Sequence, residues 1–131
     1  MGRKLQLSAR MKIREGKPEG FKRQAPVCIS RVKEKDPGKL QYDWFLNSDK
    51  TECEIREAYE SSEALLAHIA NLREPLKILF EQYVSDHSVV LYSCFKVHIV
   101  CNSLRSVLLP TGTGHYRSYQ ILVICNMISY L

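Results

Sequence analysis

The sequence predicts an α+β domain in which two helices pack on one face of a four-stranded antiparallel sheet. Three observations support this. Residues 4–13 alternate strictly between polar and apolar side chains, the period of a half-buried strand. Apolar residues then recur at helical spacing after Pro18 and again after Ser61. The order strand, helix, strand, strand, helix, strand is that of the ferredoxin-like fold.

The first helix is expected to span about residues 18–34. Pro18 suits a first helical turn, where its missing N–H costs nothing. Pro26 lies inside the pattern and predicts a kink or a break near Lys22. The stretch "KDPG" then ends the helix. Its apolar stripe consists of Phe21, Ala25, Cys28, Ile29 and Val32.

A hairpin is expected next, built from strands at about 40–46 and 52–59 and joined by the turn sequence "NSDK". Leu40, Tyr42, Trp44 and Leu46 share one face of its first strand. Glu57 lies on the same face of the second strand as Cys53, Ile55 and Tyr59. A buried carboxylate is costly without a partner, so Glu57 is expected to be paired, to sit at an edge or to have a raised pKa.

The second helix is expected to begin after a cap at Ser61 or Ser62. Pro75 predicts that it stops near Arg73 and restarts as a short piece ending near Tyr83. "SVVLY", residues 88–92, reads as the fourth strand. One face of the helix carries Leu65, His68, Ile69, Leu72 and Leu76.

Composition excludes several classes of function. A chain of 131 residues with 45% hydrophobic and 25% charged residues suits one folded domain. The formal charge of +5 is not gathered into a basic stripe, which argues against nucleic-acid binding. Five cysteines without a CxxC pair, and no secretory leader, predict a reducing cytoplasm. The cysteines and histidines lack zinc-finger spacing, so no metal site is expected. The run "ILVIC" is too short to span a membrane.

The composition changes at residue 94. Residues 1–93 form the predicted domain, and residues 94–131 contain no acidic residue and have no clear periodicity. We expect this extension to be either an added strand or helix, or a poorly ordered terminus. The sheet face away from the helices is polar with mixed charges, and it would suit either a dimer interface or water.

Residues 4–92 resemble the antibiotic biosynthesis monooxygenase family. The resemblance rests on "LSARMKIREGKPEGFK", "DPGKLQYDWFLN" and above all "REAYESSEALLAHIANL", which is similar to a strand end, a Ser-rich turn and a helix with a histidine. It implies a dimeric α+β barrel, in which the sheets of a homodimer close together and each subunit holds a cavity between sheet and helices. Beyond residue 93 the chain departs from the family pattern.

The resemblance also implies an activity. Members of this family oxygenate phenolic or quinol-type aromatics with dioxygen as co-substrate and without metal or flavin. Such chemistry needs an apolar pocket, a general base and a donor for the developing oxyanion. His68 is the expected base, Glu57 its orienting group or the base itself, and Tyr59 the donor. The expected pocket walls are Leu7, Met11, Tyr42, Trp44, Leu65 and Leu72.

Each of these assignments has a structural alternative. His68 can be a satisfied core residue, and Glu57 can pair with an arginine such as Arg73 or a neighbour's Arg10. The aromatic pair Tyr42 and Trp44 can serve the core or a dimer interface. The competing function is a non-catalytic binding or interaction dimer of the same fold. Haem degradation is disfavoured, because Tyr59 stands where those relatives have tryptophan and the first strand has no asparagine.

Overall fold

The computed structural model describes residues 5–93 and 118–125, with side-chain environments for residues 5–92. Its elements follow the predicted order, with one strand added. They are β1 (Leu5–Ile13), α1 (Pro18–Lys35), β2 (Lys39–Leu46), β3 (Glu52–Tyr59), α2 (Ser62–Tyr83), β4 (Val84–Ser93) and β5 (Ser118–Cys125).

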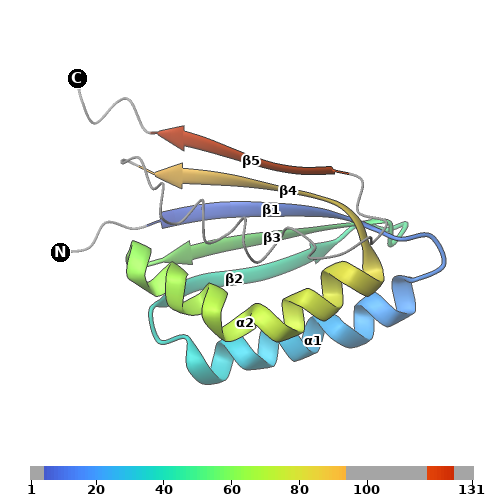
Figure 1. Cartoon of the computed structure of the whole chain (residues 1–131), viewed down its shortest axis with the longest axis horizontal. Coiled ribbons are helices and arrows are strands. Elements are labelled where there is room, and N and C mark those ends of the chain that lie inside the picture. The colour runs from blue at the N-terminus through green and yellow to red at the C-terminus, as the bar shows by residue number, and fades with distance from the viewer. Residues whose placement is uncertain (1–4, 94–117, 126–131) are drawn as a thin grey trace.

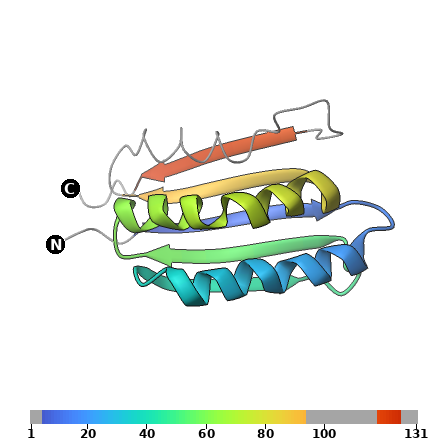
Figure 2. The ribbon, with the colours of Figure 1, turned by 60° about the horizontal axis from the view of Figure 1, so that its bottom comes forward.

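Both helices cover the same face of the sheet, so the predicted α+β, ferredoxin-like class is confirmed (Figures 1 and 2). The strand order is β2-β3-β1-β4-β5. Strands β1 to β4 pair antiparallel, whereas β5 runs parallel to β4. The core therefore lies between the sheet and the two helices.

The central strand β1 shows why the alternating sequence folds this way. Its odd-numbered side chains are buried against the helices, and the even-numbered ones face the other side of the sheet. A shift of one residue in the pairing of β1 would exchange these two faces, so burial fixes the register. Leu7 accordingly lies opposite Glu57 of β3 and Leu91 of β4.

The predicted break near Arg73 is wrong, because α2 continues through Pro75 as one helix. Proline removes one helical N–H and costs about 3 kcal/mol in a helix interior. Pro75 is itself buried, and its carbonyl accepts a hydrogen bond from Gln24 Nε2 of α1 at 3.1 Å. Burial of Leu72, Leu79 and Phe80 on either side offsets the missing backbone bond.

Helix α1 is likewise continuous, so the structure shows no break near Lys22. Pro26 lies between the buried Phe21 and Cys28, which hold the two halves of the helix on the same core. The prediction from the proline alone gave too little weight to this packing.

Strand β4 is longer than predicted. It begins at Val84 directly after α2, rather than at residue 88, and this places His87 inside the sheet opposite Met11. Part of the extension, residues 118–125, forms β5 along β4. Its remaining residues, 94–117 and 126–131, lie outside the described part of the chain.

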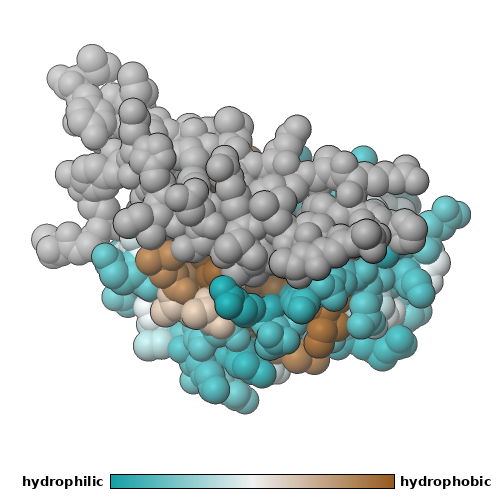
Figure 3. Space-filling view, in the orientation of Figure 1, coloured by the Kyte–Doolittle hydropathy of each residue, from teal (hydrophilic) through white to brown (hydrophobic). Residues whose placement is uncertain are grey.

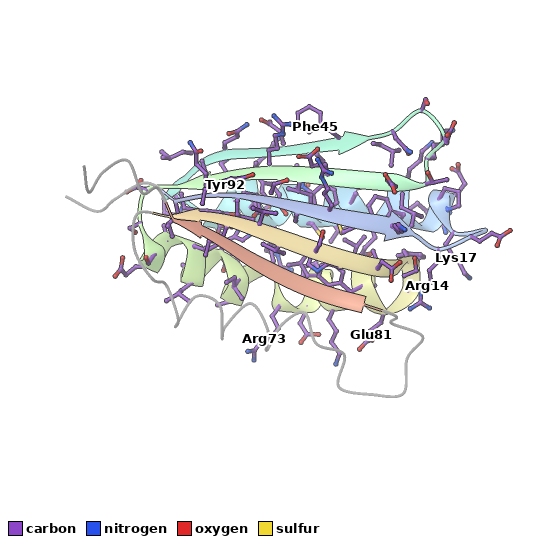
Figure 4. All side chains as sticks on the ribbon, turned by 90° about the horizontal axis from the view of Figure 1, so that it is seen from above. Arg14, Lys17, Phe45, Arg73, Glu81 and Tyr92 are labelled. Carbon is purple, nitrogen blue, oxygen red and sulfur yellow. The ribbon has the colours of Figure 1, made fainter. Side chains whose placement is uncertain are left out.

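Strand β2 is an edge strand and is buried less than expected. Tyr42 and Trp44 are half-buried under the helices, but Leu40 and Leu46 at its ends are exposed, contrary to the predicted apolar face. Figure 4 views the sheet from the side opposite the helices, where Phe45 and Tyr92 are labelled. These two side chains are 52% and 44% exposed.

The helical layer presents a largely hydrophilic surface with a few apolar patches (Figure 3). Val27 and Ile78 are exposed apolar residues on α1 and α2. No helix in the described part of the chain is long and apolar enough to cross a membrane.

Leu79→Ala tests the packing of α2 on the sheet. Leu79 is fully buried, so its truncation should lower the free energy of unfolding by about 2–5 kcal/mol. The matched control Ile78→Ala alters the neighbouring, 40% exposed side chain and should cost less than about 1 kcal/mol. Urea unfolding followed by circular dichroism measures both. Equal losses in the two variants would contradict the described burial of α2.

Candidate functional site

His68 is buried at the interface between α2 and the sheet. Only 4% of it is exposed, because α2 turns its apolar stripe, which includes Leu65 and Leu72, toward the core. Two aromatic rings flank the imidazole: the ring centroids of Tyr59 and Tyr42 lie 4.9 and 5.1 Å away. A polar ring in this position needs hydrogen-bond partners within the protein.

Asp36 provides the first partner, and the sequence reading missed it. The distance from His68 Nδ1 to Asp36 Oδ2 is 2.6 Å. Asp36 follows the last residue of α1, where its backbone N–H bonds to Val32 O, and its carboxylate is buried. The other carboxylate oxygen, Oδ1, accepts a hydrogen bond from Asn71 Nδ2.

Glu57 provides the second partner. Its Oε1 lies 3.2 Å from His68 Nε2 and accepts a hydrogen bond from the Tyr59 hydroxyl at 2.7 Å. Residues 57 and 59 share a face of β3, so both side chains point toward α2. The expected grouping of His68, Glu57 and Tyr59 is present. The alternative pairing of Glu57 with a neighbour's Arg10 stays a prediction, and Arg73 is exposed on α2. Figure 4 labels Arg73.

The directions of these hydrogen bonds determine the charge on His68. Both of its nitrogens face carboxylate oxygens, which only accept hydrogen bonds, so both nitrogens must donate. Desolvation lowers the pKa of His68, but the hydrogen bonds to Asp36 and Glu57 outweigh it and raise the pKa above its ordinary value of 6.5. The two carboxylate acceptors and the raised pKa both favour the imidazolium form of the ring.

The pKa values of Asp36 and Tyr59, at the two ends of the cluster, shift in opposite directions. Desolvation alone would raise the pKa of Asp36, but hydrogen bonds from His68 and Asn71 outweigh it and lower the pKa below 3.8. Burial, followed by the nearby negative charge of Glu57, raises the pKa of the Tyr59 phenol. Tyr59 therefore stays protonated and serves as a donor to Glu57.

An apolar cavity of about 40 Å³ lies beside this cluster. Glu57 and His68 contribute to its wall, as do four of the expected pocket residues: Leu7, Met11, Tyr42 and Leu65. Its volume corresponds to about one water molecule. The remaining lining residues are Ala9, Ile55, Ile69, Leu76, Phe80, His87 and Val89.

Two expected wall residues and the expected donor are absent from this lining. Leu72 packs with Cys28 and Val32 in a separate small core between the helices, and Trp44 packs against both cores. The hydroxyl of Tyr59 is directed to Glu57.

His87 is a lining residue that the sequence reading missed. Its ring packs on Phe80 with the centroids 4.7 Å apart, and burial lowers its pKa to about 3, so it is neutral. Extending the fourth strand back from Val89 by two residues places His87 on the buried face with Val89 and Leu91. The alternation of the strand therefore could have predicted that His87 is buried.

The sequence model of the antibiotic biosynthesis monooxygenase family matches residues 6–71, just over half of the chain. The chain belongs to this family. The matched region runs from β1 into α2, so it includes the three cluster residues Asp36, Glu57 and His68. No curated protein sequence is significantly similar to the chain.

Solved structures share the fold of this antibiotic biosynthesis monooxygenase family member. MupZ from Pseudomonas fluorescens is 22% identical, with a TM-score of 0.62 over 95% of this chain and 93% of MupZ. PA3566 from Pseudomonas aeruginosa is 19% identical, with a TM-score of 0.62 over 70% of this chain and 93% of PA3566. The MupZ alignment must therefore include residues beyond 93.

A third structure carries a functional description. A Caulobacter crescentus protein proposed to be an antibiotic biosynthesis monooxygenase is 17% identical, with a TM-score of 0.62 over 69% of this chain and 88% of that protein. At these identities the likeness establishes the fold alone.

The two buried histidines predict a stability maximum near pH 6.5. The raised pKa of His68 gives stability that is complete below 6.5 and is lost as the pH rises through the folded-state value. The lowered pKa of His87 acts on the other side: the unfolded chain takes up a proton below 6.5, so stability falls from there toward pH 3.

Urea unfolding measured from pH 4 to pH 9 tests this dependence. His68→Gln should flatten the decline above pH 6.5 and leave the acid side in place. The matched variant His87→Gln should do the reverse. Identical slopes above pH 6.5 in the parent and His68→Gln would show that His68 gains no proton affinity on folding.

Proposed function

We propose that this protein is a cofactor-independent monooxygenase that uses dioxygen to oxidise a small phenolic or quinol-type aromatic. Membership of the family supports the reaction class. The observation that carries the proposal is the buried Glu57–His68 pair in the wall of an apolar cavity. A carboxylate and an imidazolium beside an apolar space are the groups needed to remove a proton and stabilise an oxyanion.

Glu57 takes the role of general base in this proposal, and His68 the role of donor. The sequence favoured His68 as the base, but an imidazolium with two N–H donors has no free lone pair to accept a proton. Glu57 Oε1 already accepts a hydrogen bond from Tyr59 and lies 3.2 Å from His68 Nε2, whereas Oε2 accepts none from the described residues. Oε2 is therefore the atom assigned to accept the substrate proton.

Proton removal matters because dioxygen reacts slowly with closed-shell organic molecules. The substrate O–H bond breaks, its proton goes to Glu57, and the resulting phenolate is electron-rich enough to reduce dioxygen. One oxygen atom enters the product and the other leaves as water, with the substrate supplying both hydrogen atoms and both electrons of that water. The proposed reaction therefore balances without a further reductant.

An aromatic substrate needs the cavity to open. Small-molecule sites usually enclose about 300–1,000 Å³, far more than the 40 Å³ between these walls. Met11 is an unbranched, adaptable side chain, and Leu76 is only partly buried. Movement of these two wall residues is the proposed way in which a ring gains entry.

The small cavity also favours a second candidate, a non-catalytic binding or interaction dimer of the same fold. In that case the Asp36–His68–Glu57 cluster serves only to hold α1, β3 and α2 together. The two functions differ in oxygen consumption, which only the enzyme supports.

Oxygen uptake with a panel of hydroquinones and naphthoquinols tests the proposed enzyme. The parent should consume oxygen, and Glu57→Gln should lower the rate by about 10²–10⁴-fold because the amide accepts no substrate proton. The control Glu74→Gln changes an exposed carboxylate on α2 and should keep the parent rate. No uptake by the folded parent with any quinol would favour the binding dimer.

We further propose that the chain forms a homodimer through the sheet face opposite the helices. A groove of about 630 Å³ lies on this face, and its lining includes Arg10, Lys12, Phe45 and Glu54. Phe45 is half-exposed, and Glu54 of β3 pairs with Arg10 of the neighbouring strand β1 and with Arg56 of its own strand. An aromatic residue among charges of both signs is suited to an isologous contact, in which the same patch serves both subunits.

Phe45→Glu tests this dimer. The parent should sediment at about twice the chain mass of 15.1 kDa, whereas the variant should sediment as a monomer because like charges then meet at the symmetric contact. Ile78→Glu, on the helical layer, should remain dimeric. A monomeric parent in sedimentation velocity would overturn the proposed interface.

A further inference from the structure

We propose that Asp36 is a positioning residue: it holds His68 as a two-donor ring whose Nε2–H points at Glu57 Oε1, which leaves Oε2 of Glu57 for a substrate hydroxyl. The catalytic meaning of this arrangement rests on the function proposed above. The contact itself stands on the 2.6 Å separation of Asp36 Oδ2 and His68 Nδ1, whatever the reaction.

Asp36 is anchored by groups other than His68. Its backbone N–H bonds to Val32 O at 3.1 Å and so holds the end of α1. Asn71 of α2 donates to Asp36 Oδ1 and also to Lys35 O, the latter at 3.1 Å. Contacts with both helices therefore hold Asp36 in place independently of the imidazole, as a positioning group requires.

The location of Asp36 carries an electrostatic cost that needs an explanation. A negative charge at the carboxyl end of a helix is disfavoured by the helix dipole, and this one is 8% exposed. Simple helix capping would be better served by a neutral or basic residue. The hydrogen bond to a buried imidazolium provides the compensation, which ties the presence of Asp36 to the charge state of His68.

The groups that face His68 come from three directions. Asp36 approaches from the end of α1, Glu57 and Tyr59 from β3, and Tyr42 from β2. Desolvation raises the pKa of Tyr42, as it does for Tyr59, so both phenols are neutral. The charge balance is therefore two carboxylates against one imidazolium.

Removal of the Asp36 charge would change the function of Glu57. Without it, the second proton on His68 is stabilised by one carboxylate instead of two, and the buried ring tends to become neutral. A neutral ring has one N–H and cannot donate from Nδ1 and Nε2 together, so the two-donor arrangement is lost. Glu57 then acts beside a neutral donor instead of a cation, so the pair stabilises a developing oxyanion less.

The test compares Asp36→Asn with Glu34→Gln, which neutralises an exposed acid in the last turn of α1. Nuclear magnetic resonance titration of the His68 ring reports its charge without any substrate, and oxygen uptake against pH reports catalysis in the same samples. Asp36→Asn should lower the His68 titration midpoint, reduce uptake by about 10–100-fold and move the alkaline limit of activity to lower pH. Glu34→Gln should match the parent in all three.

Asn71→Ala offers a second variant if Asp36→Asn does not fold, since it removes the anchor of the carboxylate and keeps the charge. Asn71→Ala should lower the His68 midpoint by a smaller amount than Asp36→Asn. Asp36→Glu, which keeps a carboxylate, should retain part of the activity that Asp36→Asn loses. An unchanged His68 midpoint in the neutralised or unanchored variant would overturn the proposal. A shifted midpoint in a protein that consumes no oxygen supports the positioning role and refutes the proposed monooxygenase instead.

Discussion

The buried hydrogen-bonded chain from Asp36 through His68 to Glu57 is the constraint on which this structure depends. It joins the end of α1, the middle of α2 and β3, which are distant in sequence. Two carboxylates and an imidazole are costly to bury, and they are tolerated because nearly every polar atom in the group has a partner. The removal of any member would leave another charge unpaired, so the helices and the sheet are fixed relative to one another at this point.

This constraint also relates the fold to the chemistry. The same contacts that hold α2 on the sheet place a carboxylate and an imidazole donor in the wall of an apolar cavity. Low exposure makes both groups electrostatically strong, because water does not screen them. Glu57 and His68 thus come from the regular elements β3 and α2, and Asp36 directly follows the end of α1.

The parts that sequence could predict are those governed by local periodicity. Alternation in β1 and β3, and the apolar stripe that contains Leu65 and His68, follow from burial of one face, and they placed His68 and Glu57 on the core side. Asp36 escaped prediction because "KDPG" reads as a turn, and nothing local shows that its carboxylate folds back toward α2. The predicted break of α2 near Pro75 is wrong because helix propensity alone does not include the burial of Leu79 and Phe80, which stabilises the continuous helix. The pairing of β4 with β5 joins residues about thirty positions apart, which no periodicity encodes.

The direct passage from α2 into β4 limits how the molecule can adapt to a guest. Tyr83 ends the helix and Val84 begins the strand, so no flexible linker separates them. Displacement of the helix away from the sheet would therefore pull on the hydrogen bonds that β4 makes to β1 and β5. Rotation of individual side chains costs far less than such a shift, so ligand entry in this domain should leave the backbone almost unmoved, with shape selectivity set by the rotamers of the cavity wall.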